Sequence, residues 1–330
     1  SRACWAGPAV FLADSIARAG LDRAIAVDHA AAVQALCADF DGSIDLIGFH
    51  GQTVYHNASS DMQHPLGRQT IQLGDAHYLA AASAIDVVHN VRQADMDQGG
   101  EGAPLAPVYH AAVIDAMHNL RPAVLVNIGG VANLTCVSAA DGTGLIGFDT
   151  GPGNALLDDF MMSRFAVDCD RDGGLAATGS ADQTILARWM QHPYFQQTWP
   201  KSLDRQDFAG LLKTAEFRRL AAADAADAAA TLTCFTAQTI AHAIGKLPVT
   251  PQSVFVAGGG RRNGTMMQYL ASFLPMPLIT DPGDGFDADM LEAELMAFLA
   301  ARCHYRLPTS FPGTTGCRQP VSGGQIARAR

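Results

Sequence analysis

Short apolar runs bounded by turn residues alternate with helical patterns in the first third of the chain. The runs IDLIGF, TIQLG and IDVV each predict a strand, and residues 75–84, between the last two, predict a helix. Strands that alternate with helices are typical of an α/β fold. We therefore expect a first α/β layer before residue 100.

A second set of strands begins after Pro122. The runs AVLVNIGG, ANLTCV and GLIGFD lie close enough in sequence to pair as a meander before a helix opens near Asn154. Further helices are predicted at 224–244, 264–273 and 289–303, and further strands at SVFVAGGG and PLIT. The middle of the chain is therefore expected to start a new sheet.

The length of 330 residues favours two domains. The predicted helix at 105–117 and the following Pro122 indicate a boundary near residue 120. We expect one domain to comprise 1–120 with 305–330 and the other to comprise 121–304. The Gly-, Pro-, Thr- and Ser-rich tail from Pro308 is too irregular to be a domain and should return to the first one.

Composition narrows the class of protein. Apolar residues make up 48% and charged residues 16%, which is typical of a globular fold. The net charge of -10 offers no basic surface for nucleic acid. Seven scattered cysteines indicate reduced thiols, and no apolar stretch reaches membrane-spanning length. We expect a cytoplasmic protein without nucleic-acid or membrane partners and without a signal peptide.

Three glycine-rich turns stand directly after predicted strands. They are NIGGVANL (127–134), FDTGPGNALLDDF (148–160) and VFVAGGGRRNG (254–264). Glycine lets the backbone approach a ligand closely, and the free N–H groups of a following helix favour anions. Each turn alone could be an ordinary tight turn. Together they indicate a phosphate site, for which the candidate residues are Gly129, Gly130, Asn133, Thr150, Gly151, Gly153, Asn154, Gly258, Gly259, Gly260 and Asn263.

None of these turns is a Walker loop or a Rossmann fingerprint, which excludes a nicotinamide-dependent oxidoreductase. A different nucleotide fold is required. Two α/β domains that close over ATP, with the active-site cleft between them, are the arrangement of the actin, hexokinase and Hsp70 group. We expect this actin-like ATPase (ribonuclease H-like) fold.

Ordered motifs along nearly the whole chain are specific enough to indicate a family. HGQTVYH (50–56), GGEGAPLAP (99–107), NIGGVANL and DTGPGN are followed by PKSLDR, ATLTCFTAQTI, VFVAGGGRRN and DADMLEAELMAFLA. The set resembles the anhydro-N-acetylmuramic acid kinase family. The resemblance implies ATP-dependent opening of the 1,6-anhydro ring of anhydro-N-acetylmuramic acid and its phosphorylation to the 6-phosphate, in peptidoglycan recycling. It also implies Mg²⁺ as cofactor and a homodimer.

The resemblance also implies residue roles. It places the catalytic base at Asp149, whose ordinary pKa keeps it ionised at neutral pH; the alternative is a cap for the helix at Asn154. Glu292 matches a substrate-contacting glutamate, although it could be a surface residue. Arg92 is the candidate for the lactyl carboxylate, with a surface ion pair as alternative.

Other residues near these motifs complete the predicted site. His50, Gln52, Thr53 and Glu101 are expected on the sugar side. A metal site at His50 and His56 is rejected because no further ligand completes the set. The turn at 99–104 could gate the site or be rigid. Lys201 and Arg205 could reach ATP or sugar, but solvated charge is the favoured interpretation.

Two departures from the family pattern bear on activity. Family members begin with a strand and a Gly-Thr-Ser-x-Asp-Gly turn that grips ATP, whereas this sequence begins SRACWAGPAV. Asn90 and Val91 stand where the family usually has Asp and Phe. The alternative to an active kinase is therefore a catalytically impaired protein that still binds sugar or nucleotide.

Overall fold

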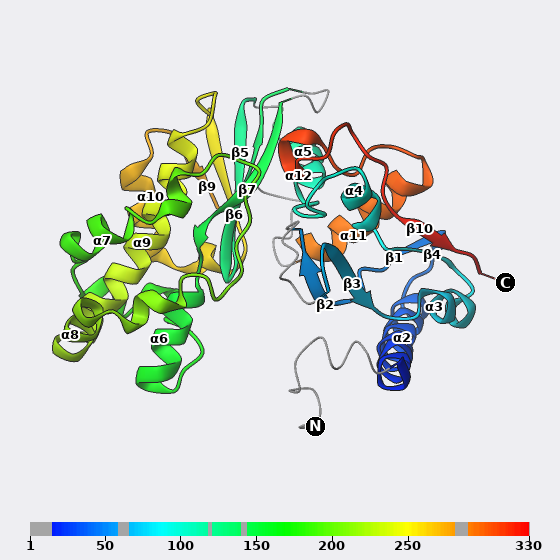
Figure 1. Cartoon of the computed structure of the whole chain (residues 1–330), viewed down its shortest axis with the longest axis horizontal. Coiled ribbons are helices and arrows are strands. Elements are labelled where there is room, and N and C mark those ends of the chain that lie inside the picture. Colours follow the sequence, from blue (N-terminus) through cyan, green and yellow to red (C-terminus); the bar gives the residue numbers. More distant parts are fainter. Residues whose placement is uncertain (1–14, 59–65, 118–120, 140–143, 281–289, 330) are drawn as a thin grey trace. The chain divides into compact units, whose positions relative to one another are not determined.

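A computed structural model of the chain describes residues 15–58, 66–117, 121–139, 144–280 and 290–329. The chain divides into two compact units, one of Ser1–Tyr109 with Met290–Arg330 and the other of His110–Asp289. Each unit combines a sheet with helices (Figure 1). The predicted α/β class is confirmed. No helix among the described residues is both long and apolar enough to cross a membrane.

The first unit is built on a three-stranded sheet of order β1-β4-β10 and a separate hairpin, β2-β3. Strand β1 pairs with β4 in parallel, and β10 pairs with β4 antiparallel, so the tail returns to this unit as predicted. Its strands are β1 (Leu46–Gly48), β2 (Gln52–Asn57), β3 (Gln69–Leu73), β4 (Asp86–His89) and β10 (Gln325–Ala327). Its helices are α2 (Ser15–Ala38), α3 (Ala76–Ser83), α4 (Gln93–Asp97), α11 (Leu291–His304) and α12 (Pro312–Thr315), and α5 (Pro107–Met117) begins here.

The second unit contains a five-stranded sheet of order β7-β6-β5-β8-β9. As predicted, β5, β6 and β7 form an antiparallel meander, while β8 and β9 add in parallel. The strands are β5 (Ala123–Ile128), β6 (Val131–Val137), β7 (Leu145–Pro152), β8 (Ser253–Ala257) and β9 (Leu278–Ile279). The α-helices are α6 (Ala155–Phe165), α7 (Gln183–Trp189), α8 (Ala215–Ala223), α9 (Ala225–Gly245) and α10 (Gly264–Phe273). Short 3₁₀ helices occupy Arg171–Gly173, Ala176–Thr178, Pro193–Gln196, Ala209–Lys213 and Gly259–Arg262.

Helices α9 and α10 cover one face of this sheet, as Figure 1 shows. Ile240 and Ile244 of α9 and Leu270 of α10 pack on alternate residues of β5, such as Val124 and Val126. Alternation is the reason: successive strand side chains point to opposite faces, so one face of β5 is apolar throughout. Asn127, near the end of β5, lies on the other face.

The unit boundaries differ from those predicted for the domains. The predicted second domain was 121–304, whereas the second unit begins within α5 and ends before α11. Helix α11 packs on β1 and β4 of the first unit. Gly48 of β1 makes room for it, because a Cβ there would overlap the carbonyl of Met296. Helical periodicity predicts where α11 lies in the sequence but not which sheet it covers.

Candidate active site

Asp149 lies in β7, the edge strand of the second unit's sheet, and a neighbouring segment covers that edge. The Asp149 backbone N–H donates to the carbonyl of Lys201 at 3.2 Å. The Tyr194 hydroxyl donates to the Asp149 carbonyl at 2.5 Å, and the Leu203 N–H donates to the Asp149 carboxylate at 2.8 Å. Both the backbone and the carboxylate of Asp149 are therefore held in one position.

The alternative role of Asp149 as a helix cap is not what the structure shows. Asn154 occupies the N-cap position of α6, without a capping hydrogen bond from its side chain, and Asp149 lies within the strand. Opposite Asp149, the pairing of β7 with β6 shifts register between Ala132 and Asn133. A bulge of this kind re-aims the side chains beside it and is common next to active sites.

Three polar side chains form a row across the sheet. Asn127 of β5 is paired with Asn133 of β6, and Asn133 is paired with Asp149 of β7. Directly paired residues point to the same face, so the Asn133 amide lies beside the carboxylate and the Asn127 amide lies one strand further along the row. All three are half-buried. Sequence reasoning missed Asn127, because its place opposite Asn133 depends on the register of the meander.

The three glycine-rich turns meet in the second unit. In the first two turns, the N–H of Gly153 donates to the Gly130 carbonyl at 2.9 Å, and the N–H of Asn154 donates to the Gly129 carbonyl at 2.7 Å. In the third turn, Gly260 packs against Ile128 and the side chain of Asn154. The three turns therefore gather in one region, and the third of them leads into the start of α10.

Side chains at these turns fix the backbone. The Asn154 amide donates to the Ile128 carbonyl at 3.3 Å, and the Asn263 side chain caps α10 by accepting from the Met266 N–H at 2.9 Å. Thr150 is buried and donates to the Ala132 carbonyl at 3.1 Å. Gly151 lies against Thr239, where a Cβ would overlap the threonine side chain. The turns are therefore braced by their own side chains and by α9.

Lys201 and Arg205 differ in environment, although both belong to the motif PKSLDR. Lys201 is only 8% exposed, so the favoured interpretation of a solvated charge is wrong for this residue. The Arg205 side chain is 48% exposed and pairs with Asp159 at 2.8 Å. Close by, burial raises the pKa of Asp158 to about 6. The sequence pattern does not distinguish a buried lysine from a solvated one.

In the first unit, His50, Arg92 and Glu292 line one cavity of about 520 Å³. Ala103, Pro104 and Leu105, from the turn after GGEG, line the same cavity. His50 follows β1, Arg92 follows β4, and Glu292 is in the first turn of α11. The packing of α11 on β1 and β4 therefore unites three residues that are far apart in the sequence.

Arg92 and His50 hold each other in this cavity. The imidazole Nδ1–H of His50 donates to the Gly51 carbonyl at 2.8 Å, which leaves Nε2 to accept from Arg92 Nη2 at 2.9 Å. Burial, followed by the charge of Arg92, lowers the pKa of His50, which favours this neutral form. Arg92 Nη1 also donates to the Gly102 carbonyl at 2.8 Å. A guanidinium fixed in this way offers its charge to an anionic ligand.

Three other predicted residues do not line that cavity. The Gln52 side chain is exposed and contacts the Thr53 carbonyl, while the Thr53 hydroxyl accepts from Gln72 at 3.3 Å. The Glu101 backbone N–H donates to the Thr315 carbonyl at 2.7 Å. Burial, followed by the charge of Asp95, raises the pKa of the Glu101 carboxyl group.

A second, polar cavity of about 370 Å³ in the first unit is lined by His50, Gln72 and Asn90 among others.

Asp95 is a buried carboxylate that sequence reasoning did not identify. It accepts from the Gly102 N–H at 2.7 Å, the Ser310 hydroxyl at 2.5 Å and the Thr315 hydroxyl at 2.6 Å. These bonds tie the turn at 99–104 to the C-terminal tail. The turn could gate the site or be rigid, and these hydrogen bonds support the rigid interpretation.

Among the described residues, no group of three or more His, Cys, Asp or Glu residues could hold a metal ion.

Comparison with known proteins gives one family. The model of the family "Anhydro-N-acetylmuramic acid kinase" matches residues 12–329. The anhydro-N-acetylmuramic acid kinase of Rhodopseudomonas palustris strain HaA2 is 46% identical over 312 residues, covering 93% of this chain and 80% of that protein. The protein of the same name from Bradyrhizobium diazoefficiens is 44% identical over 328 residues, covering 97% and 85%.

Solved structures give weaker likenesses. The activator of 2-hydroxyisocaproyl-CoA dehydratase from Clostridium difficile, with bound ADPNP, has a TM-score of 0.37 and 15% identity, covering 58% of this chain and 63% of that chain. A ROK family glucokinase from Streptomyces griseus, in complex with glucose and AMPPNP, has a TM-score of 0.34 and 11% identity, covering 82% and 87%.

Proposed function

Because this chain belongs to the anhydro-N-acetylmuramic acid kinase family, we propose that it opens the 1,6-anhydro ring of 1,6-anhydro-N-acetylmuramic acid and transfers phosphate from ATP to give N-acetylmuramic acid 6-phosphate. The observation that carries this proposal is the family match over residues 12–329. No comparison favours the alternative of an impaired binding protein.

Asp149 is the proposed base. Its carboxylate takes a proton from water as the water oxygen attacks the anomeric carbon, and the bond from that carbon to the ring oxygen breaks. This released oxygen is the bridging oxygen of the 1,6-anhydro ring, attached to carbon 6; it takes the γ-phosphoryl group of ATP, and ADP leaves. The hydrogen bond from the Leu203 N–H holds the carboxylate in position. A base of this kind contributes about 10² to 10⁴-fold in rate.

The three glycine-rich turns are the proposed site for the phosphates of ATP. This assignment covers Gly129, Gly130, Asn133, Thr150, Gly151, Gly153, Asn154, Gly258, Gly259, Gly260 and Asn263. Mg²⁺ would supply charge neutralisation for the phosphates. Mg²⁺ prefers oxygen ligands and retains several waters, so the amide oxygens of Asn127 and Asn133, in the same row as Asp149, fit a hydrated ion.

The cavity of the first unit is the proposed sugar side. Arg92 is the proposed partner of the lactyl carboxylate, and Glu292 the proposed acceptor of a hydrogen bond from a sugar hydroxyl; both line this cavity. His50 lines the same cavity, while Gln52, Thr53 and Glu101 are assigned to the sugar from the family motif alone. Family membership is also the basis for proposing a homodimer, a cytoplasmic location and a role in peptidoglycan recycling.

The test of the proposed function is a product assay. The purified protein is incubated with Mg-ATP and the anhydro sugar, and ADP and the sugar 6-phosphate are followed by mass spectrometry. The wild type should form both products, and Asp149→Asn should reduce the rate by about 10² to 10⁴-fold. Asp168→Asn makes the same chemical change at an exposed carboxylate of the same unit and should keep the wild-type rate. Equal rates for both variants would contradict the role of Asp149, and absence of product from the wild type would contradict the function.

Arg92→Lys tests the sugar side separately. Lysine keeps the charge but loses the planar fork that contacts Gly102 and His50. We expect the KM for the sugar to rise about tenfold, with little change in the KM for ATP, because about 1.4 kcal/mol of binding corresponds to a factor of ten. An unchanged sugar KM would contradict the carboxylate role.

A further inference from the structure

A cavity of about 230 Å³ in the second unit has no role in the proposed reaction. It lies between β7, α9 and the segment 195–201, and of the residues assigned to ATP it is lined by Thr150 but by none of the glycines. Six of its lining side chains define its chemistry. Three are basic, Lys201, His242 and Lys246, and three are aromatic, Phe148, Phe195 and Trp199.

The three basic side chains converge on one short stretch of backbone. Lys201 Nζ donates to the Tyr194 carbonyl at 3.2 Å, and Lys246 Nζ donates to the next carbonyl, that of Phe195, at 2.5 Å. The His242 Nε2 atom lies 3.2 Å from the same Phe195 carbonyl. Two ammonium groups and an imidazole are therefore neighbours at the wall of the cavity.

This positive charge lacks a carboxylate partner. No acidic side chain lines the cavity, and neither Lys201 nor Lys246 forms an ion pair with any described residue. The ring of Tyr194, 4.2 Å from Lys201 Nζ, compensates only in part. Burial, followed by repulsion from Lys246, lowers the pKa of Lys201 to about 8, although the charge of Asp149 acts in the opposite direction. Lys246 is exposed to solvent, but Lys201 is buried, and a buried charge is normally paired, so an anion is the component that this cavity lacks.

The aromatic walls define the body of that anion. Phe148 and Trp199 are stacked, with ring centroids 5.5 Å apart and an interplanar angle of 11°, and Phe195 adds a third ring. At about 30 Å³ per water, the cavity has the volume of roughly eight water molecules. A nucleotide is far larger, and the mainly apolar lining offers few partners for the hydroxyl groups of a sugar.

We propose that this cavity binds a small organic anion, a monocarboxylate with a flat apolar body, whose carboxylate lies at Lys201 and Lys246. Occupancy should also change the rate of the reaction, a consequence that rests on the proposed function. The reason is that the Lys201 carbonyl and the Tyr194 hydroxyl both bond to the backbone of Asp149. An anion that draws Lys201 toward itself acts on the segment that positions the base.

Benzoate is the probe, and calorimetric titration of the intact protein measures its binding. The wild type should bind benzoate, while inorganic phosphate, which lacks the apolar body, and benzyl alcohol, which lacks the charge, should bind at least tenfold more weakly. Lys246→Gln should also weaken benzoate binding about tenfold or more, because a charge-assisted hydrogen bond is lost. Lys213→Gln removes an exposed lysine of the same unit and should leave binding unchanged.

Trp199 provides a second readout that does not depend on the lysine variants. Benzoate should change the tryptophan fluorescence of the wild type, and the change should be lost in Trp199→Phe, which keeps an aromatic ring in the wall. Absence of benzoate binding, equal binding by Lys246→Gln, or equal binding of phosphate would overturn the site. If benzoate binds but does not change the rate of an active kinase, the binding site stands and only the proposed effect on Asp149 is overturned.

Discussion

At the scale of single residues, Gly258 shows how backbone geometry limits the choice of side chain at the nucleotide turns. Its φ is 78° and its ψ is 174°, a region in which only glycine is common. A Cβ there would also lie 2.5 Å from the Asn127 amide oxygen and 2.7 Å from the Ile128 carbonyl oxygen. The third turn can therefore approach β5 only because residue 258 has no side chain.

Gly258→Ala should destabilise the protein by about 3 kcal/mol, since backbone strain and overlap each cost roughly 1 to 3 kcal/mol. Urea unfolding measures the loss. Gly259→Ala is the matched control, because the nearest atom to its Cβ is the Asn154 amide nitrogen at 3.9 Å. Equal stability of the two variants would show that the turn relaxes around residue 258.

His110 is a buried histidine whose protonation opposes folding. It lies 4% exposed in α5, with Nδ1 2.7 Å from the Thr135 hydroxyl oxygen, and burial lowers its pKa from 6.5 to about 4. The unfolded state therefore binds the proton more readily than the folded state. The stabilising contribution of neutral His110 is complete above pH 6.5 and is lost as the pH falls toward 4.

This loss should amount to about 3 kcal/mol at pH 4. Urea unfolding of the wild type and of His110→Asn, measured across this pH range, isolates the contribution, because asparagine is polar but does not titrate. The variant should be less stable at neutral pH but should lose less stability on acidification. Parallel curves would mean that other groups account for the acid sensitivity.

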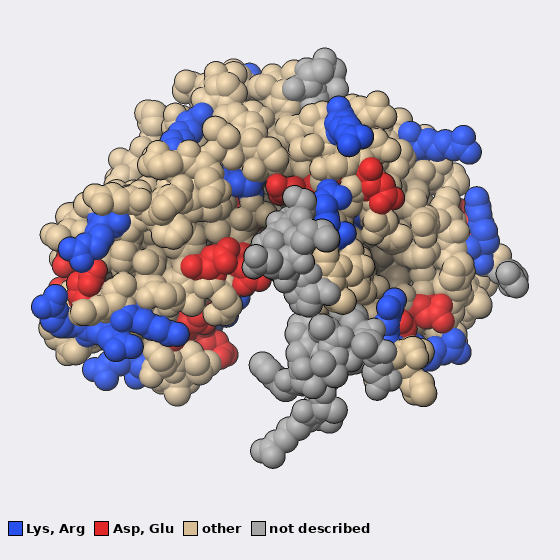
Figure 2. All heavy atoms as spheres, viewed as in Figure 1, with Lys and Arg blue, Asp and Glu red and all other residues tan. Residues whose placement is uncertain are grey.

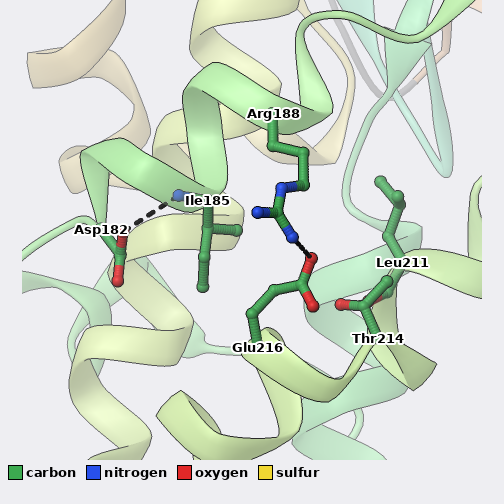
Figure 3. Close-up of polar contacts among 6 residues, drawn as sticks. All are labelled: Asp182, Ile185, Arg188, Leu211, Thr214 and Glu216. Carbon is green, nitrogen blue, oxygen red and sulfur yellow. Dashed lines mark hydrogen bonds and ion pairs between the residues drawn. The ribbon is translucent and has the colours of Figure 1, made fainter.

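At the scale of elements, helix α7 depends on its N-terminal cap. The Asp182 carboxylate accepts from the Thr184 N–H at 2.8 Å and from the Ile185 N–H at 3.0 Å. Figure 3 shows the second of these bonds and, from the same helix, the ion pair of Arg188 with Glu216 at 2.7 Å. The Arg188 side chain is 64% exposed, so solvent and salt screen that pair.

Asp182→Ala should lower the free energy of unfolding by about 1 kcal/mol, because two backbone donors lose their acceptor. Glu216→Gln should have a much smaller effect, and that effect should vanish at high salt. Chemical denaturation at low and high salt compares the two variants. A larger loss of stability for Glu216→Gln than for Asp182→Ala would show that the ion pair contributes more than the cap.

At the scale of the whole molecule, the second unit is one continuous stretch of chain with its own sheet and core. One of its apolar clusters lies under α9 and α10, and another joins aromatic residues such as Phe195, Phe217 and Phe235. The first unit, in contrast, needs two separate stretches. On the face displayed in Figure 2, both units carry acidic as well as basic side chains.

Residues 107–289, expressed alone, should therefore fold and unfold cooperatively, since a domain with its own core can fold independently. Far-ultraviolet circular dichroism should report helix and strand, and one urea transition should be seen. Residues 1–109 alone should fail this test, because α11 and β10 of that unit are missing. A fragment 107–289 without a cooperative transition would show that its fold needs the rest of the chain.

The sequence alone determined the class of fold, most elements and the family. These features depend on local patterns: short apolar runs bounded by turn residues predict β5 to β8, and helical periodicity predicts α9 and α10. The motifs from HGQTVYH to the segment at α11 identify the family. Part of the last motif, 287–289, lies outside the described residues, as does the start SRACWAGPAV. Helix α2 was not predicted, because its polar and apolar residues do not separate clearly onto two faces.

Only the tertiary structure decided which residues meet. The row of Asn127, Asn133 and Asp149 depends on strand register, and the burial of Lys201 depends on how the segment after Tyr194 folds over the edge of β7. The same is true of α11, which the sequence assigned to the second domain. Local patterns describe how each residue relates to its near neighbours in the chain. A site is made by contacts between residues far apart in sequence, and packing selects those contacts.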